Sequence, residues 1–318
     1  MTRTMPTVTE IHRYPVKSML GEDLASVRVT ANGLAGDRTH AVLDATGAVG
    51  SAKHPRKWGA LLRCRSRLTA AGIPEVELPD GSRFPAGDPG LDDRLTGLLG
   101  REVAVAGVGD EAGDEAGAGI RAGFRAGVVR GEPGRLERVV PEYEGGVPDK
   151  VRATASRDAG GDLVTLSSVA PGTFFDFGRV HLVTGSALAH LRTVHPAGDF
   201  DARRFRPNLV VGGGEGTGTG EGPAFPEDDW AGAVLRVGEA LFRVTLPTPR
   251  CVVPTLAHGA LPPDPGIMRA VARTHRVPVL DLGRLACFGV YLDVLEPGTV
   301  RVGDPVGVEG GAGRAGRA

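Results

Sequence analysis

Thr245-Leu-Pro-Thr-Pro-Arg-Cys-Val-Val-Pro-Thr255 places one cysteine, Cys251, in a segment stiffened by three prolines. A proline lacks a backbone N–H and fixes its own φ angle, so neither a regular helix nor a central strand is expected across Cys251. The segment therefore predicts a rigid loop, which loses little conformational freedom when it orders. Loops held in this way often carry the residues of a functional site.

Cys251 has two interpretations. Arg250, next to the thiol, favours the thiolate, which is the form that acts as a nucleophile and binds soft metals. The alternative is a buried small hydrophobic residue, because unpaired cysteines are among the most buried residues in proteins. The residues of the loop alone leave both interpretations open.

Hydrophobic patterns on both sides of this loop indicate the elements that hold it. Alternating apolar residues over 230–237 and 240–245 predict two strands joined by a turn at Gly238 and Glu239, and the second strand leads into the loop. After the cysteine, Asp264 and Pro265 are suited to begin a helix through residues 267–271.

Helical spacing of apolar residues also occurs between 187 and 194, directly after a strand-like run at 180–184. Thr184 or Ser186 can cap the start of this helix. The free amides and the dipole of a helix start favour a phosphate, so Thr184 marks either an anion site or a plain N-cap.

Short strands are predicted to dominate the first half of the chain. The pair Asn32-Gly33 tolerates the positive φ angles of a tight turn, which predicts that segments 25–30 and 38–43 pair as an antiparallel hairpin. Lys17 and Ser18 follow the first strand at a loop mouth. There they either reach a ligand or form a solvated turn.

The composition is that of an ordinary globular protein with one large or two smaller domains: 318 residues, of which 41% are hydrophobic. The 37 basic and 38 acidic residues nearly cancel, which argues against nucleic acid or an anionic membrane as a partner. Cys64, Cys251 and Cys287 are widely spaced, which argues against disulfides, a zinc ribbon or an iron–sulfur cluster. Because no segment approaches the roughly 18 apolar residues of a membrane span, a cytoplasmic protein is expected.

Several segments are rich in glycine or charge. Residues 107–134 repeat Gly, Ala, Glu, Asp and Arg, which predicts a flexible insertion before the junction of two halves. The run 212–222 lacks the Gly-Lys-Ser/Thr of a phosphate loop and is predicted to be a flexible loop, and 309–318 a disordered tail. Basic residues concentrate at 51–67, either as a solvated face or as the lining of an anion site.

Many short strands, hairpin turns and two or three helices predict an α+β protein that is mainly β. A first β-barrel region is expected over 5–140, including the insertion, and a second over 160–308. The two regions would hold a cofactor in a cleft between them.

Five separated motifs make the chain resemble the MOSC-domain family, the C-terminal domain family of molybdenum cofactor sulfurase, with that family's N-terminal β-barrel region in front. The motifs stand in the family's order across nearly the whole chain. Within the family, the chain is most similar to molybdenum cofactor-binding reductases of the amidoxime-reducing type. The motifs are Tyr14-Pro-Val-Lys-Ser18, Gly33-Leu-Ala-Gly-Asp-Arg38, Phe205-Arg-Pro-Asn208, Pro249-Arg-Cys251 and Pro297-Gly-Thr-Val-Arg-Val-Gly-Asp-Pro305.

The resemblance implies a molybdenum cofactor (Mo-molybdopterin) in the cleft, with Cys251 as metal ligand and catalytic residue. It implies the reduction of small N-hydroxylated compounds. Electrons would come from an external protein such as a ferredoxin, a flavodoxin or a reductase, because no cluster or dinucleotide motif is evident in the sequence. The cofactor-binding residues that it implies are Lys17, Ser18, Arg38, Thr184, Arg206, Asn208 and Arg250.

The match is interrupted around the cysteine, which leaves other functions open. The reductases have a serine two residues before it and Thr-Thr-Val-Asp-Pro after it, where this chain has Pro249 and a different run that includes His258. His258 lies either near the substrate or on the surface. One alternative function is a sulfur carrier with a persulfide on Cys251, although no pyridoxal-phosphate desulfurase domain is evident to load it. Another is a cofactor-binding module without turnover.

Overall fold

The computed structural model describes residues 5–107, 155–157, 163–165, 174–213, 223–280 and 282–309, and the structural statements below concern this part of the chain. Nearly all of the predicted insertion at 107–134, most of the junction before 160, most of the loop 212–222 and the tail from 310 lie outside it.

The largest sheet has nine strands among the described residues. They are β1 (Thr7–Arg13), β2 (Glu22–Asp23), β12 (Val180–Thr184), β13 (Leu209–Gly212), β14 (Val234–Val237), β15 (Ala240–Pro249), β16 (Arg276–Pro278), β17 (Arg284–Glu296) and β19 (Val306–Glu309). Their order across the sheet is β19-β14-β15-β17-β12-β13-β1-β2, with β16 beside β17.

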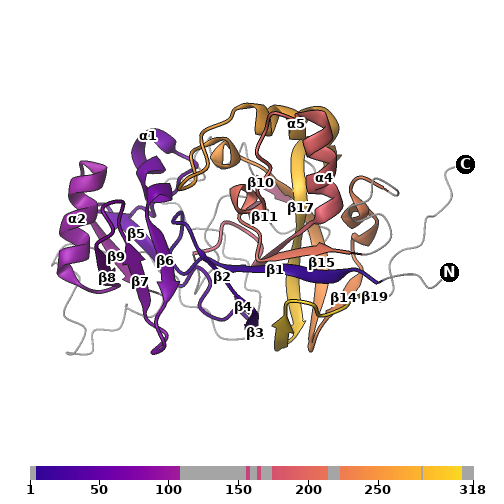
Figure 1. Cartoon of the computed structure of the whole chain (residues 1–318), viewed down its shortest axis with the longest axis horizontal. Helices are drawn as coiled ribbons and strands as arrows, with labels where there is room; N and C mark the ends of the chain where they lie inside the picture. Colours follow the sequence, from indigo (N-terminus) through magenta and orange to yellow (C-terminus); the bar gives the residue numbers. More distant parts are fainter. Residues whose placement is uncertain are drawn as a thin grey trace, which may run out of the picture.

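Smaller sheets and four α-helices complete the described chain (Figure 1). The smaller sheets comprise β3 (Ser26–Thr30), β4 (Gly33–Leu34) and β18 (Gly298–Arg301); β5 (His40–Asp44) and β9 (Val103–Gly107); β6 (Arg65–Leu68), β7 (Pro74–Glu77) and β8 (Arg83–Pro85); and β10 (Ala155–Arg157) and β11 (Leu163–Thr165). The helices are α1 (Pro55–Trp58), α2 (Pro89–Leu99), α4 (Gly185–Val194) and α5 (Gly266–Thr274), with single 3₁₀ turns η1 (Gly59–Arg63), η2 (Ala202–Phe205), η3 (Pro226–Trp230) and η4 (Val253–Thr255).

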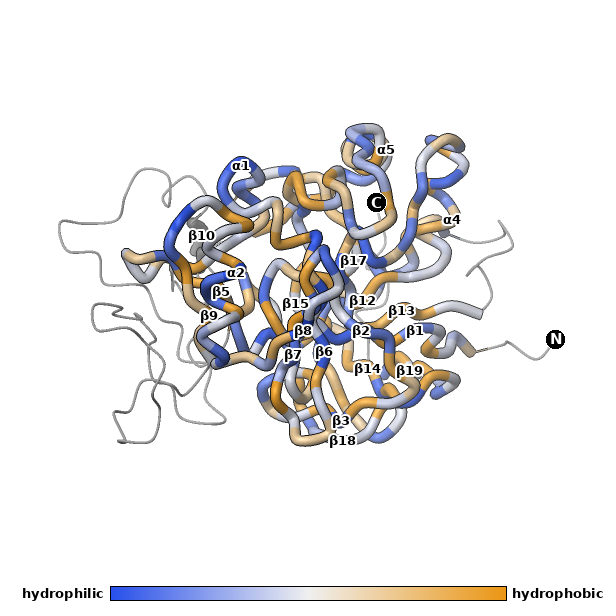
Figure 2. The backbone as a smooth tube through the Cα atoms, turned by 60° about the vertical axis from the view of Figure 1, so that its left-hand side comes forward, coloured by the Kyte–Doolittle hydropathy of each residue, from blue (hydrophilic) through white to orange (hydrophobic). Residues whose placement is uncertain are grey.

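The large sheet curls into a half-barrel, so the described structure is mainly β, as expected. Strand β1, from the first half of the chain, pairs antiparallel with β13, and a bridge joins Thr7 of β1 to Pro305, next to β19. The neighbouring strands β12 and β13 are parallel and buried along their whole length, which explains why their sequences are almost continuously apolar (Figure 2).

The two predicted helices of the second half are confirmed as α4 and α5. The hydroxyl of Thr184 accepts the N–H of Ala187 at the start of α4, and the carboxylate of Asp264 accepts the N–H of Gly266 at the start of α5. Both helices lie against the large sheet at the end of the molecule opposite α1 and α2 (Figure 1). Apolar residues of both helices, including Leu191 and Val271, share one core cluster with Phe288 of β17. No helix among the described residues is long and apolar enough to cross a membrane.

The hairpin predicted between 25–30 and 38–43 is wrong. Strand β3 pairs instead with β4 and β18, while β5 pairs with β9 in another sheet. The turn at Asn32-Gly33 does form, but it joins β3 only to the two residues of β4. The backbone then turns sharply at Gly36 and Arg38, which have φ angles of 81° and 49°, and leaves this sheet.

The proline-rich stretch is more regular than predicted. Strand β15 continues to Pro249, and its pairing with β17 shifts register at Pro247 and Pro249. A bulged position needs no ladder donor, so prolines are tolerated there. The predicted turn at Gly238 and Glu239 is confirmed by the β14–β15 hairpin, and Cys251 lies in irregular backbone just past the strand.

Candidate functional site

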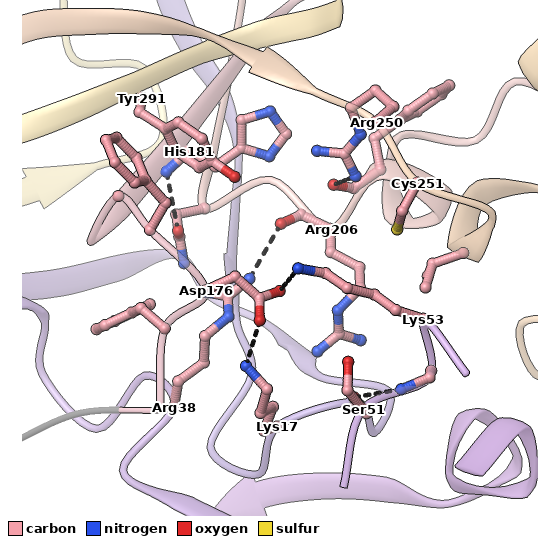
Figure 3. Close-up of a pocket in the computed structure, with 18 of the residues that line it drawn as sticks. Lys17, Arg38, Ser51, Lys53, Asp176, His181, Arg206, Arg250, Cys251 and Tyr291 are labelled. Carbon is pink, nitrogen blue, oxygen red and sulfur yellow. Dashed lines mark hydrogen bonds and ion pairs between the residues drawn. The ribbon is translucent and has the colours of Figure 1, made fainter. Parts of the chain in front are cut away.

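Seven of the eight predicted site residues line one cavity of about 90 Å³, which we call the central cavity. Residues from both halves of the chain form its wall, and Thr184 is the predicted residue that is missing from it. Figure 3 shows polar side chains from several different segments that point into this space. The lining includes Lys17, Ser18, Arg38, Asn208, Arg206, Arg250 and Cys251, together with Ser51, Lys53, Asp176, His181 and Tyr291.

Three of the predicted residues reach the cavity from an unusual backbone conformation. Ser18, Arg38 and Arg206 have φ angles of 64°, 49° and 53°, and only one other residue besides glycine in the described chain, Leu280, has a positive φ. Such conformations cost energy for residues with a Cβ atom and tend to cluster at functional sites. The fold therefore maintains strained backbone at three points around this one cavity.

Two lysines meet a single carboxylate at the cavity wall. The carboxylate of Asp176 lies 2.7 Å from Nζ of Lys17 and 2.9 Å from Nζ of Lys53 (Figure 3). Lys17 also donates to the backbone carbonyl of Phe174, at 2.7 Å, and its side chain is almost fully buried. The hydroxyl of Ser18 accepts the N–H of Ala52, which fixes the segment that carries Lys53.

Cationic groups outnumber carboxylates around the cavity. Burial lowers the pKa of Lys17. Burial alone would raise the pKa of Asp176, but the two lysines outweigh it and hold this pKa well below its usual range. Asp176 is thus charged. One carboxylate in the lining faces five cationic side chains, those of Lys17, Arg38, Lys53, Arg206 and Arg250.

Asn208 lies at the cavity wall and connects three segments of the chain by hydrogen bonds. Its side-chain carbonyl accepts the N–H of His181, and its amide donates to the carboxylate of Asp37 and to the backbone carbonyl of His12. Asp37 is buried and also accepts from the guanidinium of Arg38 and from the N–H of Tyr14. Both N–H donors of the Asn208 side chain are used within the protein, so this residue orients the cavity wall.

Two arginines of the lining have N–H groups that are not all used in hydrogen bonds. Arg250 donates from Nη2 to the carbonyl of Phe205, at 2.8 Å, and Arg206 lies with its guanidinium carbon 4.2 Å from the ring centre of Tyr14. Nε of Arg250 and Nη2 of Arg206 are buried without a hydrogen-bond partner among the described residues. A buried donor in this state marks a place where a ligand or water must bind. Cys251 is half-buried beside these groups.

The segment that follows Cys251 is held by a buried arginine that sequence reasoning did not single out. Arg204 is fully buried and donates to the backbone carbonyls of Asp199 and Pro262 at 2.7 and 2.8 Å. Its Nη1 is shared between the carbonyls of Pro254 and Leu256. These bonds fix the irregular backbone from 253 to 262.

Thr184 and His258 lie elsewhere. The hydroxyl of Thr184 donates to the carboxylate of Glu227 at 2.7 Å, and Glu227 is buried, which raises its pKa to about 7. Thr184 is therefore a plain N-cap next to an internal carboxyl group, not part of the central cavity. His258 is 3% exposed, so the surface position considered for it is wrong. It lines a different cavity, because its Nδ1 bonds the carbonyl of Leu256 and turns the ring inward.

Asp176, His181 and Tyr291 are cavity residues that sequence reasoning missed, and Lys53 was included only within the basic run 51–67. The one local signal for Asp176 is an acidic residue in the run Phe174-Phe-Asp-Phe177, where a charge among aromatic residues needs a buried partner. His181 and Tyr291 lie on paired strands whose apolar pattern gives no such signal.

Comparison with known protein families identifies two domains in this chain. Residues 172–307 match the MOSC domain, and residues 5–85 match the MOSC N-terminal beta barrel domain. The chain is a MOSC-domain protein. Both matched regions contribute to the central cavity of this MOSC protein.

Its relatives are distant. Mitochondrial amidoxime reducing component 2 of Rattus norvegicus is 26% identical over 320 residues, which cover 94% of this chain and 82% of the relative. Mitochondrial amidoxime-reducing component 1 of Homo sapiens is 24% identical over 322 residues, with the same coverage of 94% and 82%. Among solved structures, YiiM from Geobacillus stearothermophilus has a TM-score of 0.31 and 18% identity over 49% of this chain and 70% of that one, which adds nothing to the fold.

Proposed function

We propose that this MOSC protein is a molybdenum cofactor-dependent oxidoreductase that reduces N-hydroxylated compounds. The observation that carries the proposal is the central cavity, where five cationic side chains face one carboxylate beside a half-buried cysteine. A pterin that bears a phosphate needs charge-assisted bonds of this kind, and a metal held by sulfur ligands suits a cysteine thiolate.

The residues present fit such a cofactor. Arg206 and Arg250 each have a buried donor without a partner, and Lys17 and Lys53 share a single counter-ion. Lys17, Arg38 and Arg206 would hold the anionic groups of the cofactor, and Cys251 would ligate the metal. When bound, the cofactor supplies the two-electron redox chemistry, while the protein binds, orients and tunes it.

The chain's own groups supply proton control. Reduction of an N–OH group to N–H releases water and consumes two electrons and two protons. Burial lowers the pKa of Lys17, so its ammonium group gives up a proton more readily than an exposed lysine does. Asp176 accepts a hydrogen bond from Nζ of Lys17 and so fixes the position of that proton. Lys17 is the group we assign to holding a proton at the cavity wall.

The substrate class rests on the relatives, which are named amidoxime reducing components and align over 94% of this chain. The departures at Pro249 and after Cys251 alter the surroundings of the thiol, so the substrate is proposed only as a class. The proposal includes an external electron donor such as a ferredoxin or a flavodoxin with its reductase, and a cytoplasmic location.

Metal and pterin analysis tests the proposal. Protein from a host that makes the cofactor is expected to contain about one molybdenum per chain, and Arg38→Ala is expected to lower that content while the exposed Arg28→Ala control keeps it. NADPH alone should give no turnover with an N-hydroxylated substrate, a protein or chemical one-electron donor should give turnover, and Cys251→Ser should abolish it. A preparation with neither molybdenum nor pterin refutes the proposal, and labile sulfur without metal would support a sulfur carrier instead.

A further inference from the structure

A second cavity, of about 130 Å³, shares Arg206 with the central cavity. Its polar lining comes from the start of the chain and from the segment after Cys251. The residues on which the argument rests are Tyr14, Arg65, Arg206 and His258.

Three polar atoms of this lining are buried without a hydrogen-bond partner among the described residues. They are Oη of Tyr14, Nη2 of Arg206 and Nε2 of His258. Tyr14 and His258 are only 2% and 3% exposed. Because an unpaired buried polar atom costs free energy, three of them around one cavity indicate a ligand that bonds all three.

The charges around the second cavity favour an anion. Arg65 and Arg206 donate to the backbone carbonyls of Gly21 and Met19, and neither has a carboxylate within ion-pair distance in the described part of the chain. Burial, and then repulsion from Arg38, lowers the pKa of Arg206 to about 10.

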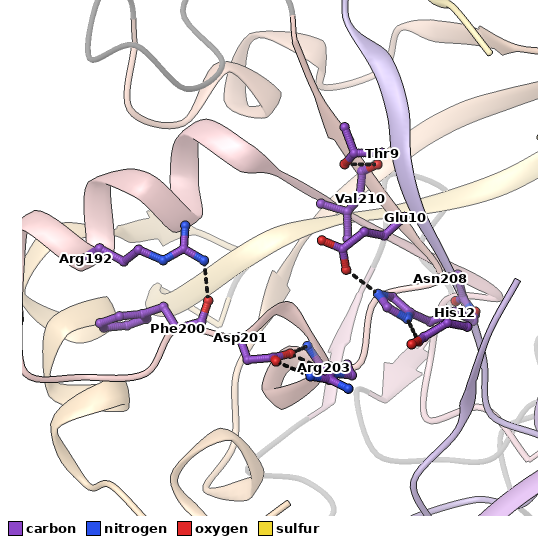
Figure 4. Close-up of polar contacts among 10 residues, drawn as sticks. Thr9, Glu10, His12, Arg192, Phe200, Asp201, Arg203, Asn208 and Val210 are labelled. Carbon is purple, nitrogen blue, oxygen red and sulfur yellow. Dashed lines mark hydrogen bonds and ion pairs between the residues drawn. The ribbon is translucent and has the colours of Figure 1, made fainter. Parts of the chain in front are cut away.

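The other charged groups of the lining are already paired. His12 lies 2.9 Å from a carboxylate oxygen of Glu10, and Arg203 bonds Asp201 (Figure 4). His12 also lies 2.7 Å from a carboxylate oxygen of Asp23. Glu22 pairs with Arg13. Glu22 thus has one cationic partner, and Asp23 shares the ring of His12 with Glu10. The cations of the lining that have no carboxylate partner in the described chain are Arg65 and Arg206.

His258 adds a requirement for a proton on the ligand. Its Nδ1 lies 2.9 Å from the carbonyl oxygen of Leu256, which can only accept, so Nδ1 carries the hydrogen. Burial lowers the pKa of His258 to about 4, so the ring is neutral at pH 7. Nε2 therefore offers a lone pair and needs a donor from the ligand.

We propose that the second cavity binds a small tetrahedral oxyanion that carries a proton, of which hydrogen phosphate is the simplest example. Its charged oxygens accept from Arg65, Arg206 and Tyr14, and its hydroxyl group donates to Nε2 of His258. This site adjoins the central cavity and shares Arg206 with it, but it needs neither metal nor turnover. Phosphate binding can therefore be measured without the proposed reductase activity.

Calorimetric titration in phosphate-free buffer tests the site, with protein that carries the pterin so that the cationic central cavity is already filled. Inorganic phosphate is expected to bind once per chain, and sulfate, which has no proton for His258 at neutral pH, at least tenfold more weakly. Tyr14→Phe removes only an unpartnered hydroxyl, and Arg65→Gln changes an exposed residue, so both variants should fold. Each should weaken phosphate binding roughly tenfold or more, since a bond to a charged group is lost.

Arg67→Gln is the matched control, because Arg67 lies on the same strand, pairs with Glu75 and does not line the cavity. It should leave phosphate affinity unchanged. The proposal is overturned if phosphate does not bind, if sulfate binds as tightly, or if Arg67→Gln weakens binding as much as Arg65→Gln. Phosphate binding only by protein that lacks the cofactor would also overturn it, since the anion would then occupy the central cavity.

Discussion

Replacing Arg204 by lysine should destabilise the protein and loosen the segment after Cys251. Arg204 is fully buried, and its three guanidinium nitrogens reach four backbone carbonyls. A lysine keeps the charge but has one nitrogen in place of a planar fork, so it cannot span carbonyls from residues 199 to 262.

The expected loss in the free energy of unfolding follows from the hydrogen bonds of Arg204. The two short bonds, of 2.7 and 2.8 Å to Asp199 and Pro262, and the shared Nη1 amount to three donors, of which lysine can replace about one. Each lost bond to a charged donor costs about 1.5–3 kcal/mol, and relaxation of the segment recovers part of it. We expect a loss of about 3 kcal/mol in the free energy of unfolding, and a fall in melting temperature of roughly 5 °C or more.

Urea denaturation measures the loss in the free energy of unfolding. The rate at which a disulfide reagent modifies Cys251 measures how far the segment after it has loosened. Cys64 and Cys287 are buried and should react only on unfolding, so the fast thiol reports the segment. Arg203→Lys is the control, because Arg203 is exposed and paired with Asp201 and should change stability by no more than about 1 kcal/mol. A change below about 1 kcal/mol in Arg204→Lys, with an unaltered thiol rate, would refute the role given to Arg204.

Two further predictions concern charge. Asp176→Asn leaves two lysines without their counter-ion and should cost about 1–3 kcal/mol at neutral pH, a value reduced because Asp176 is a third exposed. Since the pKa of Asp176 is lowered from 3.8, its contribution is present above that value and disappears as pH falls through the folded pKa, so the urea midpoints of wild type and variant should converge in acid. For His12, burial alone would lower the pKa, but Glu10 and Asp23 outweigh it and raise the pKa above 6.5. Its contribution is therefore present below 6.5 and is lost as pH rises through the folded value, and a stability difference between wild type and His12→Gln that stays constant with pH would contradict this.

Local patterns predicted the elements that local interactions define. The α4 and α5 helices follow from apolar spacing, from the cap at Thr184 and from Asp264, which accepts the N–H of Gly266 at the start of α5. The β14–β15 hairpin follows from alternation around Gly238. The pairing of β3 and β5 could not be predicted in the same way. The partner of β3 is β18, which lies some 270 residues away in the sequence. The chain also turns sharply at Arg38, which has a positive φ, and an arginine in the sequence does not predict such a turn.

The candidate site shows the same division. Motif residues such as Lys17 and Arg38 were named from the sequence because the family resemblance covers them, whereas Asp176 was not, since its significance depends on two lysines brought to it by folding. The sequence also left the position of His258 open. Its buried position depends on contacts such as the bond from its ring to the carbonyl of Leu256, which a single sequence does not display.

The motif residues in and behind the central cavity fall into two groups with different tasks. Asp37 and Asn208 form hydrogen bonds within the protein, to each other and to the backbone of Tyr14, His181 and His12. These bonds join β1, β12 and the turn that carries Arg38. Arg206 and Arg250 keep buried donors unpaired. Because the first group fixes the backbone, the strained conformations at Arg38 and Arg206 can persist and direct two guanidinium groups at one space despite their mutual repulsion. A substitution in the first group should therefore lower anion binding indirectly, through the position of the arginines, even though those arginines remain in the chain.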